Sequence, residues 1–279
     1  MLLSLLGAGC LSHTTKVEPP STALLNASLD DLLGKIRELA EIQSMKATVD
    51  LQLTYLNDER TRQKELSETR GFILARRPGH IRVQAQVPVT GQRALDMTSD
   101  GSTFRVFLPW QQRFYEGDNN LAKRSEKRTE NIRPQHILQP LLVDPVGPNE
   151  TPVLDQVTEG FRHYYVVLLL VPRDGEQGLR ISRKLWFDRT TLMLSRMEIW
   201  NADNQVATLA RYRIWTEQAG VPSFAQEVVV SRPLDGYDLA IRFVKPGINE
   251  PVPDDSFVLE PPKGVDVQVV GEDDPPPTT

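Results

Sequence analysis

The sequence holds a single cysteine, Cys10, among its 279 residues. One thiol can form neither an internal disulfide nor a cysteine-based zinc cluster. The four histidines, His13, His80, His136 and His163, are scattered, and none stands at a metal-ligand spacing from another. We therefore expect no metal and no cofactor.

Long apolar runs and an excess of basic charge are also missing. A helix that spans a bilayer needs about 20 apolar residues, and the longest apolar run beyond the N-terminus, 164–171, has the length of a strand. The 32 Lys and Arg stand against 37 Asp and Glu, which gives a net charge of −5. Nucleic-acid-binding domains usually carry a basic excess, so we do not expect nucleic acid as a partner.

Signatures of catalysis are absent as well. The chain has no G-x-S-x-G, no phosphate-binding loop, no H-E-x-x-H and no dinucleotide fingerprint. The carboxylate pairs at 30–31 and 254–255 are adjacent in sequence, and neighbours on a strand point to opposite faces, so neither pair is a natural acid–base couple. Folding could still bring two distant carboxylates together. We predict a binding protein rather than an enzyme.

The N-terminus has the pattern of a processing signal. Residues 1–9, MLLSLLGAG, are apolar and end in small residues before Cys10. They resemble a lipoprotein signal whose cysteine receives the lipid, although the run is short and lacks a basic start, which a start codon farther upstream would explain. The alternative is an apolar N-terminus with an incidental free cysteine. We expect a signal peptide at 1–9, an acylated Cys10 and a proline-containing tether over 10–28.

A helix is predicted over 29–43, because its apolar residues recur at helical spacing and Ser28 and Asp31 approximate a capping box. From residue 45 the apolar period changes to two, which is typical of half-buried antiparallel strands. Turn-forming residues separate further strands. The expected strands are 45–56, 68–76, 80–87, 92–98, 103–108, 153–158, 161–171, 179–188, 192–201, 205–216, 224–232 and 237–245.

The alternating pattern stops after residue 117. A charged stretch, 119–130, follows, and then a short proline-interrupted helix within 131–142. No linker separates the two groups of strands, and the helices that parallel crossovers would need are missing. We predict one mainly β domain over 29–268, built on a curved antiparallel sheet, and a disordered tail over 269–279.

The strands carry a surplus of apolar residues on alternating positions. Two interpretations are open. Either these residues form one packed core under the early helix, or the concave face exceeds what the helices can fill and leaves an apolar cleft for acyl chains. The candidate cleft residues are Leu51, Leu53, Val83, Leu95, Met97, Phe104, Val106, Phe187, Met197 and Tyr212. We expect the cleft to lie between the helix 29–43 and the sheet.

Several motifs follow one another in a recognisable order. The strand 71–76 leads into an arginine–proline turn at Arg77, an S-D-G turn at 99–101 precedes an aromatic strand that ends in Pro109, and 253–265 reads F-x-x-x-P-P-x-G-V in its second half. Together these stretches resemble the LolA/LolB family of lipoprotein carriers and receptors, over about 29–268. The resemblance implies an open half-barrel of about eleven antiparallel strands, with helices over its concave face and an apolar cavity that holds acyl chains.

The resemblance also implies roles for two residues. Arg77 would hold the helical lid, and Val89, in the hairpin 87–91, would touch a membrane or an acylated partner. Pro78 biases Arg77 toward extended geometry, so its guanidinium can project from the strand end toward helix-end carbonyls. Both residues have a plain alternative, an exposed arginine and an exposed valine on an ordinary surface.

The signal-like N-terminus and the resemblance together imply an outer-membrane lipoprotein that faces the periplasm and binds acyl chains of lipids or lipoproteins, for transport or localisation in the cell envelope. Two rivals remain. A scaffolding lipoprotein would have a filled core, which a cavity in the structure would tell apart. An envelope hydrolase would need convergent polar groups in a cleft.

Overall fold

The computed structural model describes residues 23–57, 62–119, 131–173, 175, 177–218 and 220–270. Cys10, the expected signal peptide and most of the tether lie outside these residues, as does 120–130 of the charged stretch. No helix in the described part of the chain is long and apolar enough to cross a membrane.

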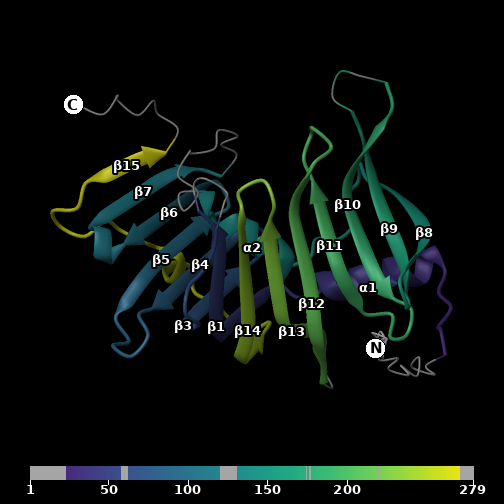
Figure 1. The fold of residues 1–279 in the computed structure, drawn as a ribbon, viewed down its shortest axis with the longest axis horizontal. Coiled ribbons are helices and arrows are strands. Elements are labelled where there is room, and N and C mark those ends of the chain that lie inside the picture. Colours follow the sequence, from purple (N-terminus) through teal and green to yellow (C-terminus); the bar gives the residue numbers. More distant parts are fainter. Residues whose placement is uncertain are drawn as a thin grey trace, which may run out of the picture.

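Most of the described chain forms one large, open and curved β-sheet (Figure 1). It has fifteen strands, of which fourteen follow one another side by side while β2 pairs with β1 alone. The strands are β1 (Ser44–Leu56), β2 (Gln63–Glu65), β3 (Thr69–Arg76), β4 (His80–Gln86), β5 (Arg93–Asp100), β6 (Thr103–Leu108), β7 (Arg113–Asp118), β8 (Thr151–Glu159), β9 (Arg162–Pro172), β10 (Leu179–Asp188), β11 (Leu194–Trp200), β12 (Val206–Gln218), β13 (Val221–Arg232), β14 (Tyr237–Ile248) and β15 (Val267–Val270).

The sheet consists of two halves that meet at β1. Strands β3 to β7 and then β15 lie on one side of β1, and β14 down to β8 lie on the other. β1 pairs antiparallel with both β3 and β14, so an early strand and a late strand are neighbours in the centre. This pairing joins the two groups of strands into a single sheet.

The expected mainly β architecture is confirmed, but the number of about eleven strands is too low. All twelve expected strands are present, and the additional ones are β2, β7 and β15. β2 is three exposed polar residues, and β15 is four residues of which three are exposed, so neither has the alternation that marks a half-buried strand. β15 pairs with β7 in parallel, which is an exception to the antiparallel sheet. It includes residues 269–270 of the expected tail, and 271–279 lie outside the described residues.

Two α-helices lie on the concave face in the described part of the chain. α1 (Leu29–Ala40) has the predicted capping box: the Ser28 hydroxyl accepts the Asp31 N–H at 3.2 Å, and the Asp31 carboxylate accepts the Ser28 N–H at 2.8 Å. Its residues Leu32 and Ile36 are fully buried, and the helix contacts β13. α2 (Pro134–Leu141) is the predicted proline-interrupted helix and contacts β4, β5 and β13.

The C-terminal segment covers part of the outer face. After β14 the chain passes through the short 3-10 helix η3 (Asp254–Phe257), which contacts β4 and β5. Arg82 donates to the carbonyl of Ser256 at 2.9 Å and to both carboxylate oxygens of the fully buried Asp96. Thr98 donates to the carbonyl of Phe257 at 2.8 Å. The Arg82 guanidinium therefore neutralises the buried Asp96 carboxylate and also holds the C-terminal segment against β4 and β5.

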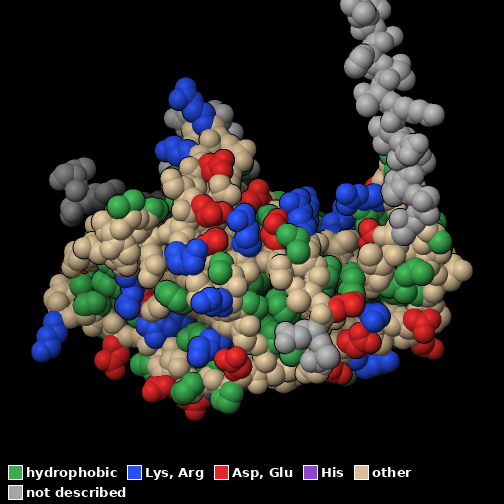
Figure 2. Space-filling model, turned by 90° about the horizontal axis from the view of Figure 1, so that it is seen from below, with side chains coloured by type: hydrophobic (Ala, Val, Ile, Leu, Met, Phe, Trp, Pro, Cys, Tyr) green, Lys and Arg blue, Asp and Glu red, His purple; other side chains and the backbone are tan. Residues whose placement is uncertain are grey.

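The surface carries charges of both signs. Figure 2 shows Lys and Arg side chains interspersed with Asp and Glu over the face in that view. Such mixing agrees with a net charge of only −5 over 279 residues.

Candidate functional site: an apolar cleft on the concave face

The half of the concave face that contains β1 and β3 to β7 holds a cleft of about 980 Å³. Its lining runs from β14 across β1 and β3 to β7 and reaches β15. From β14 to β15 there are seven steps between neighbouring strands, and at about 4.8 Å per step they cover about 34 Å along the curved sheet. Pockets for small molecules commonly measure about 300–1,000 Å³, so this cleft lies at the upper end of that range.

The described lining is almost wholly apolar. It includes residues of the inner face of each strand, such as Leu51 and Leu53 of β1, Met97 of β5 and Phe104 of β6. The lining contains no Asp, Glu, Lys, His or Cys, and its one charged side chain is Arg113. Elsewhere in the described chain, no group of three or more His, Cys, Asp or Glu lies together so as to hold a metal ion.

The structure brings seven of the ten predicted cleft residues together. These are Leu51, Leu53, Val83, Leu95, Met97, Phe104 and Val106. The other three, Phe187, Met197 and Tyr212, belong to the packed core of the other half. Phe187 and Met197 are each 1% exposed, and the Tyr212 hydroxyl donates to the carbonyl of Pro140 in α2 at 2.9 Å. Burial raises the pKa of Tyr212, which keeps this phenol a neutral donor.

The cleft lies in a different place from the one predicted, because no residue of α1 lines it. α1 covers the half of the sheet that contains β13, and its buried face fills that space. Between α1, α2 and β12 to β14 only about 20 Å³ remains, little more than the roughly 10–15 Å³ that one water needs. Both interpretations of the apolar surplus thus apply: one packed core runs under α1 and α2 from β9 to β5, and a cleft remains along β1 and β3 to β7.

Two connections form the mouth of the cleft at one end of the strands. The β4–β5 and β6–β7 connections are two strands apart in an antiparallel meander, so they lie at the same end. Pro88 of the first and Trp110 of the second, in the 3-10 helix η1 (Pro109–Gln111), line the cleft. Trp110 is 74% exposed, which is unusual for so large an apolar ring.

Val89 projects from the same end. It is fully exposed and has a φ of 74°, a left-handed conformation that β-branched residues rarely adopt. The N–H of Val87 donates to the carbonyl of Gln92 at 2.7 Å. The N–H of Gly91 donates to the carbonyl of Val87 at 3.0 Å. These bonds close the turn and place Val89 at its tip.

Arg77 lies at the opposite end of the strands, in the β3–β4 connection. Its Nε donates to the carbonyl of Ile42 at 3.0 Å, just after α1, and its Nη2 donates to that of Val143 at 2.7 Å, just after α2. The guanidinium also forms an ion pair with Asp144, and its side chain is only 15% exposed. One side chain thus joins the carbonyl ends of both helices to the sheet.

A second arginine fastens the chain that follows α2. Arg183 of β10 donates to the carbonyls of Asp144 and Pro145, at 2.9 Å each, and pairs with Glu150. Burial of Glu150 opposes its ionisation, but hydrogen bonds from Arg183, the Gly147 N–H and the Ser182 hydroxyl outweigh this effect and lower the pKa of Glu150. The segment that follows α2 is therefore held by the ionised pair of Arg183 and Glu150 at neutral pH.

Several lining residues were missed in the sequence, above all Trp110, Arg113, Tyr115 and Ile132. Arg113 and Tyr115 lie on β7, which was not predicted, although their spacing of two is the strand signal. Ile132 precedes α2, and no pattern in the sequence indicates that it reaches the sheet.

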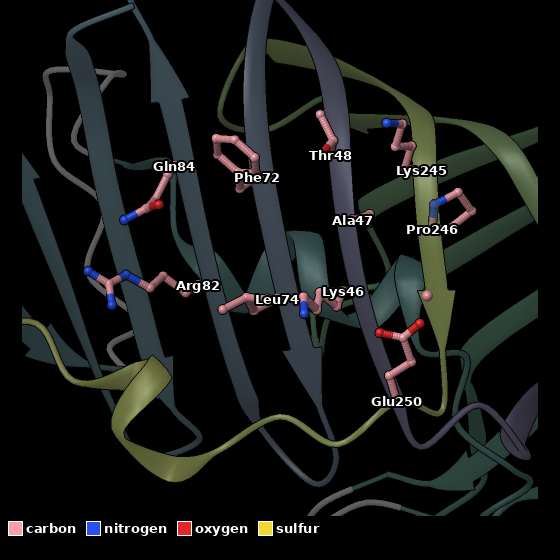
Figure 3. Close-up of a pocket in the computed structure, with 11 residues that line it drawn as sticks. Lys46, Ala47, Thr48, Phe72, Leu74, Arg82, Gln84, Lys245, Pro246 and Glu250 are labelled. Atoms are coloured by element: carbon pink, nitrogen blue, oxygen red, sulfur yellow. The ribbon is translucent and has the colours of Figure 1, made fainter.

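A second hollow lies on the outer face. This groove of about 510 Å³ is bordered by β1, β3, β4 and β14, with Phe72, Leu74, Lys46 and Lys245 along it (Figure 3). Phe72 and Leu74 alternate with the buried Ile73 of β3. The continuous apolar run 71–75 is the sequence signal for a strand with apolar residues on both faces.

No family model and no curated protein sequence matches the chain. Solved structures do match its fold. A LolA superfamily protein from Nitrosomonas europaea superposes with a TM-score of 0.50 and 14% identity, over 84% of this chain and 99% of that one. The chain shares its fold with this LolA superfamily protein.

Two further structures share this LolA-superfamily fold with the chain. A DUF1329 family protein from Desulfovibrio piger matches with a TM-score of 0.53 and 12% identity, over 82% of this chain and 95% of that one. A proposed outer membrane lipoprotein-sorting protein domain from Vibrio parahaemolyticus matches with a TM-score of 0.50 and 8% identity, over 82% and 97%. At such identities the likeness concerns the fold, as the resemblance in the sequence motifs implied.

The contacts of Arg77 predict a marked effect on stability. Arg77→Ala removes two charge-assisted hydrogen bonds at the helix ends, so we expect the free energy of unfolding to fall by about 1–3 kcal/mol in urea denaturation. Arg242→Ala is the control, because Arg242 is 57% exposed and lies 3.5 Å from Glu68. Its effect should stay within about 0.5 kcal/mol. Equal effects of the two substitutions would show that Arg77 is an ordinary surface arginine.

Proposed function

We propose that the protein binds acyl chains of lipids or of acylated lipoproteins in the cleft and transports or localises them in the cell envelope. The observation that carries this proposal is the apolar cleft of about 980 Å³ on the concave face. Removal of hydrocarbon from water favours binding by about 0.8 kcal/mol per methylene. The LolA-superfamily fold supports the same function, since the Vibrio parahaemolyticus domain that shares it is a proposed lipoprotein-sorting protein.

The cleft also bears on the two rival functions. A scaffolding protein with a filled core would have no such space. A hydrolase would need a general base to activate a hydroxyl such as that of the lining Ser67, and the described lining has no carboxylate, histidine or cysteine. Both observations favour binding of apolar ligands.

In this proposal Arg77 holds the lid. The ends of α1 and α2 are attached to the sheet through its guanidinium, and Ile132, two residues before α2, lines the cleft. A shift of α2 against the sheet would therefore change the space available to a ligand. Arg77 would resist that shift at the end opposite the mouth.

Val89 would contact the membrane or the acylated partner during delivery. Folding does not benefit from an exposed apolar residue with a positive φ, and backbone strain of about 1–3 kcal/mol persists mainly at functional sites. The position of Val89 beside the cleft mouth would let it touch the membrane that receives the ligand.

The anchor in this proposal is Cys10, acylated and held in the outer membrane, with the domain in the periplasm. Residues 23–28 are the described end of the tether, and the Leu25 N–H donates to the carbonyl of Arg189 in the domain at 2.7 Å. The distance from this point to Cys10 is 15 residues, which would let the domain move some way from the membrane.

The first test of the proposed function fills the cleft. Val106→Trp places an indole in the cleft from β6, and we expect at least a tenfold loss in affinity for a fluorescent fatty-acid probe. The control is Phe107→Trp, because Phe107 is the next residue of β6 and faces the other side of the sheet. Titration of fluorescence gives both affinities. Failure of the wild-type protein to bind the probe, or unchanged binding by Val106→Trp, would contradict the lipid-binding function.

The second test concerns delivery. Val89→Glu should leave the melting temperature nearly unchanged, because Val89 is fully exposed, and should slow the transfer of bound probe to liposomes by severalfold. Thr90→Glu adds the same charge to the neighbouring residue and should slow transfer much less. A large drop in melting temperature, or equal transfer by the two variants, would count against a delivery role for Val89.

The third test concerns the anchor. We expect radiolabelled palmitate to label the protein expressed with a complete bacterial signal peptide, and labelling to disappear in Cys10→Ser. Cys10→Ser should also move the protein from the membrane fraction to the soluble fraction. The lipoprotein assignment fails if neither protein is labelled.

A further inference from the structure

We infer that the mouth of the cleft docks on a lipid bilayer through the exposed apolar side chains of its rim, Leu66, Val87, Val89 and Trp110, so that acyl chains pass directly between bilayer and cleft. This inference rests on the proposed function, because it names the partner with which the same cleft exchanges its ligand. It extends the contact from Val89 to the whole rim, and it needs no carrier protein as donor or acceptor of the ligand.

The rim consists of three separate connections at one end of the strands. In the antiparallel order β1, β3, β4, β5, β6, β7 every second connection lies at the same end, which places the segment between β2 and β3 beside the β4–β5 and β6–β7 connections. Each of the three carries an exposed apolar side chain: Leu66 is 49% exposed, Val89 fully and Trp110 74%. Leu66 and Trp110 also line the cleft, so the rim continues its apolar surface.

The two connections at the opposite end of the same strands lack such side chains. The β3–β4 connection is Arg77-Pro78-Gly79, and the β5–β6 connection is Gly101-Ser102. Small or polar residues of this kind are the ordinary choice for exposed turns. Exposed apolar side chains on three neighbouring turns therefore indicate a surface that meets something apolar.

The amount and the arrangement of this apolar surface favour a bilayer over a protein. Four partly exposed side chains offer roughly 400–500 Å², whereas one side of a stable protein interface needs about 800 Å². The side chains also stand apart on separate turns around an opening, so a rigid partner would leave gaps between them, while fluid lipid fills such gaps. Trp110 suits this place, because a tryptophan ring combines an apolar body with a polar N–H and is enriched where a membrane meets water.

A docked mouth also removes the main cost of exchange. Each methylene that passes from the cleft into water loses the free energy gained on binding. With the rim inserted, the acyl chain moves from an apolar cleft into an apolar bilayer without this exposure. The base of the cleft stays fixed meanwhile, because Arg77 holds the helix ends at the opposite end of the strands.

The experiment measures association with vesicles of phosphatidylcholine, whose headgroup carries no net charge. All proteins are the full chain with Cys10→Ser, so that neither acylation nor the N-terminal run distinguishes them. We expect Trp110→Gln and Leu66→Gln each to weaken co-sedimentation with the vesicles by about three- to tenfold, because each removes apolar area from the rim. The control is Phe161→Gln, which should leave the binding unchanged. Phe161 is 86% exposed but belongs to the β8–β9 connection, at the opposite end of the other half of the sheet.

Tryptophan fluorescence locates the contact. Vesicles whose acyl chains carry bromine quench an indole that reaches the hydrocarbon. Trp110 is the most exposed of the four tryptophans, since Trp186 is 8% exposed and Trp200 and Trp215 are half-buried. We expect these vesicles to quench the Cys10→Ser protein. Trp110→Phe should lose the quenching but keep most of the binding, because it retains an apolar ring in the rim.

A fluorescent fatty-acid probe is titrated separately, without vesicles, to tell failure of this inference from failure of the proposed function. Absence of probe binding would overturn the proposed function itself. Probe binding without vesicle binding would overturn the docking of the mouth alone. Vesicle binding without quenching, or an equal loss in Phe161→Gln, would place the contact elsewhere and overturn it too. Unchanged vesicle binding by Trp110→Gln and Leu66→Gln would also overturn it and would leave a protein as the partner of the rim.

Discussion

Two short helices face a sheet that is too wide for them to cover. α1 has 12 residues and α2 has 8, so at 1.5 Å per residue they are about 18 and 12 Å long. The fourteen strands that lie side by side extend over about 62 Å at 4.8 Å per step. The inner face is mostly apolar, and what the helices do not cover must stay open or receive something else. The packed core under α1 and the cleft beside it follow from this one mismatch.

The two ends of the strands differ in how firmly they are held. At one end Arg77 and Arg183 attach the helix ends and the segment after α2 to the sheet through backbone carbonyls. At the other end the exposed Trp110 and Val89 project beside the cleft mouth. Ionised, buried contacts resist movement, whereas exposed turns have few contacts to lose. This asymmetry suits a site that is fixed at its base and exchanges ligand at its mouth.

The outer face has its own covering, which supports the inner one. The buried Asp96 requires a cation, and Arg82 supplies it while it donates to the carbonyl of Ser256 in the C-terminal segment. The same segment then leads to β15, which extends the sheet beside β7. The segment thus covers β4 and β5 on the face opposite the cleft. A strand that is open on both faces would lack this support.

Periodicity in the sequence determined most of the local structure. The change from helical spacing to alternation after α1, together with explicit turns, was enough for twelve strands, both helices and the single sheet, because each of these signals arises from near neighbours in the chain. The same alternation identified seven cleft residues, but it could not separate them from Phe187 and Met197, which have the same pattern. Whether an inner-face residue meets a helix or open space depends on where α1 and α2 lie, and long-range contacts such as those of α1 with β13 and of Arg77 with Ile42 and Val143 decide that. The tertiary structure alone therefore decided which parts of the apolar face became packed core and which became cleft.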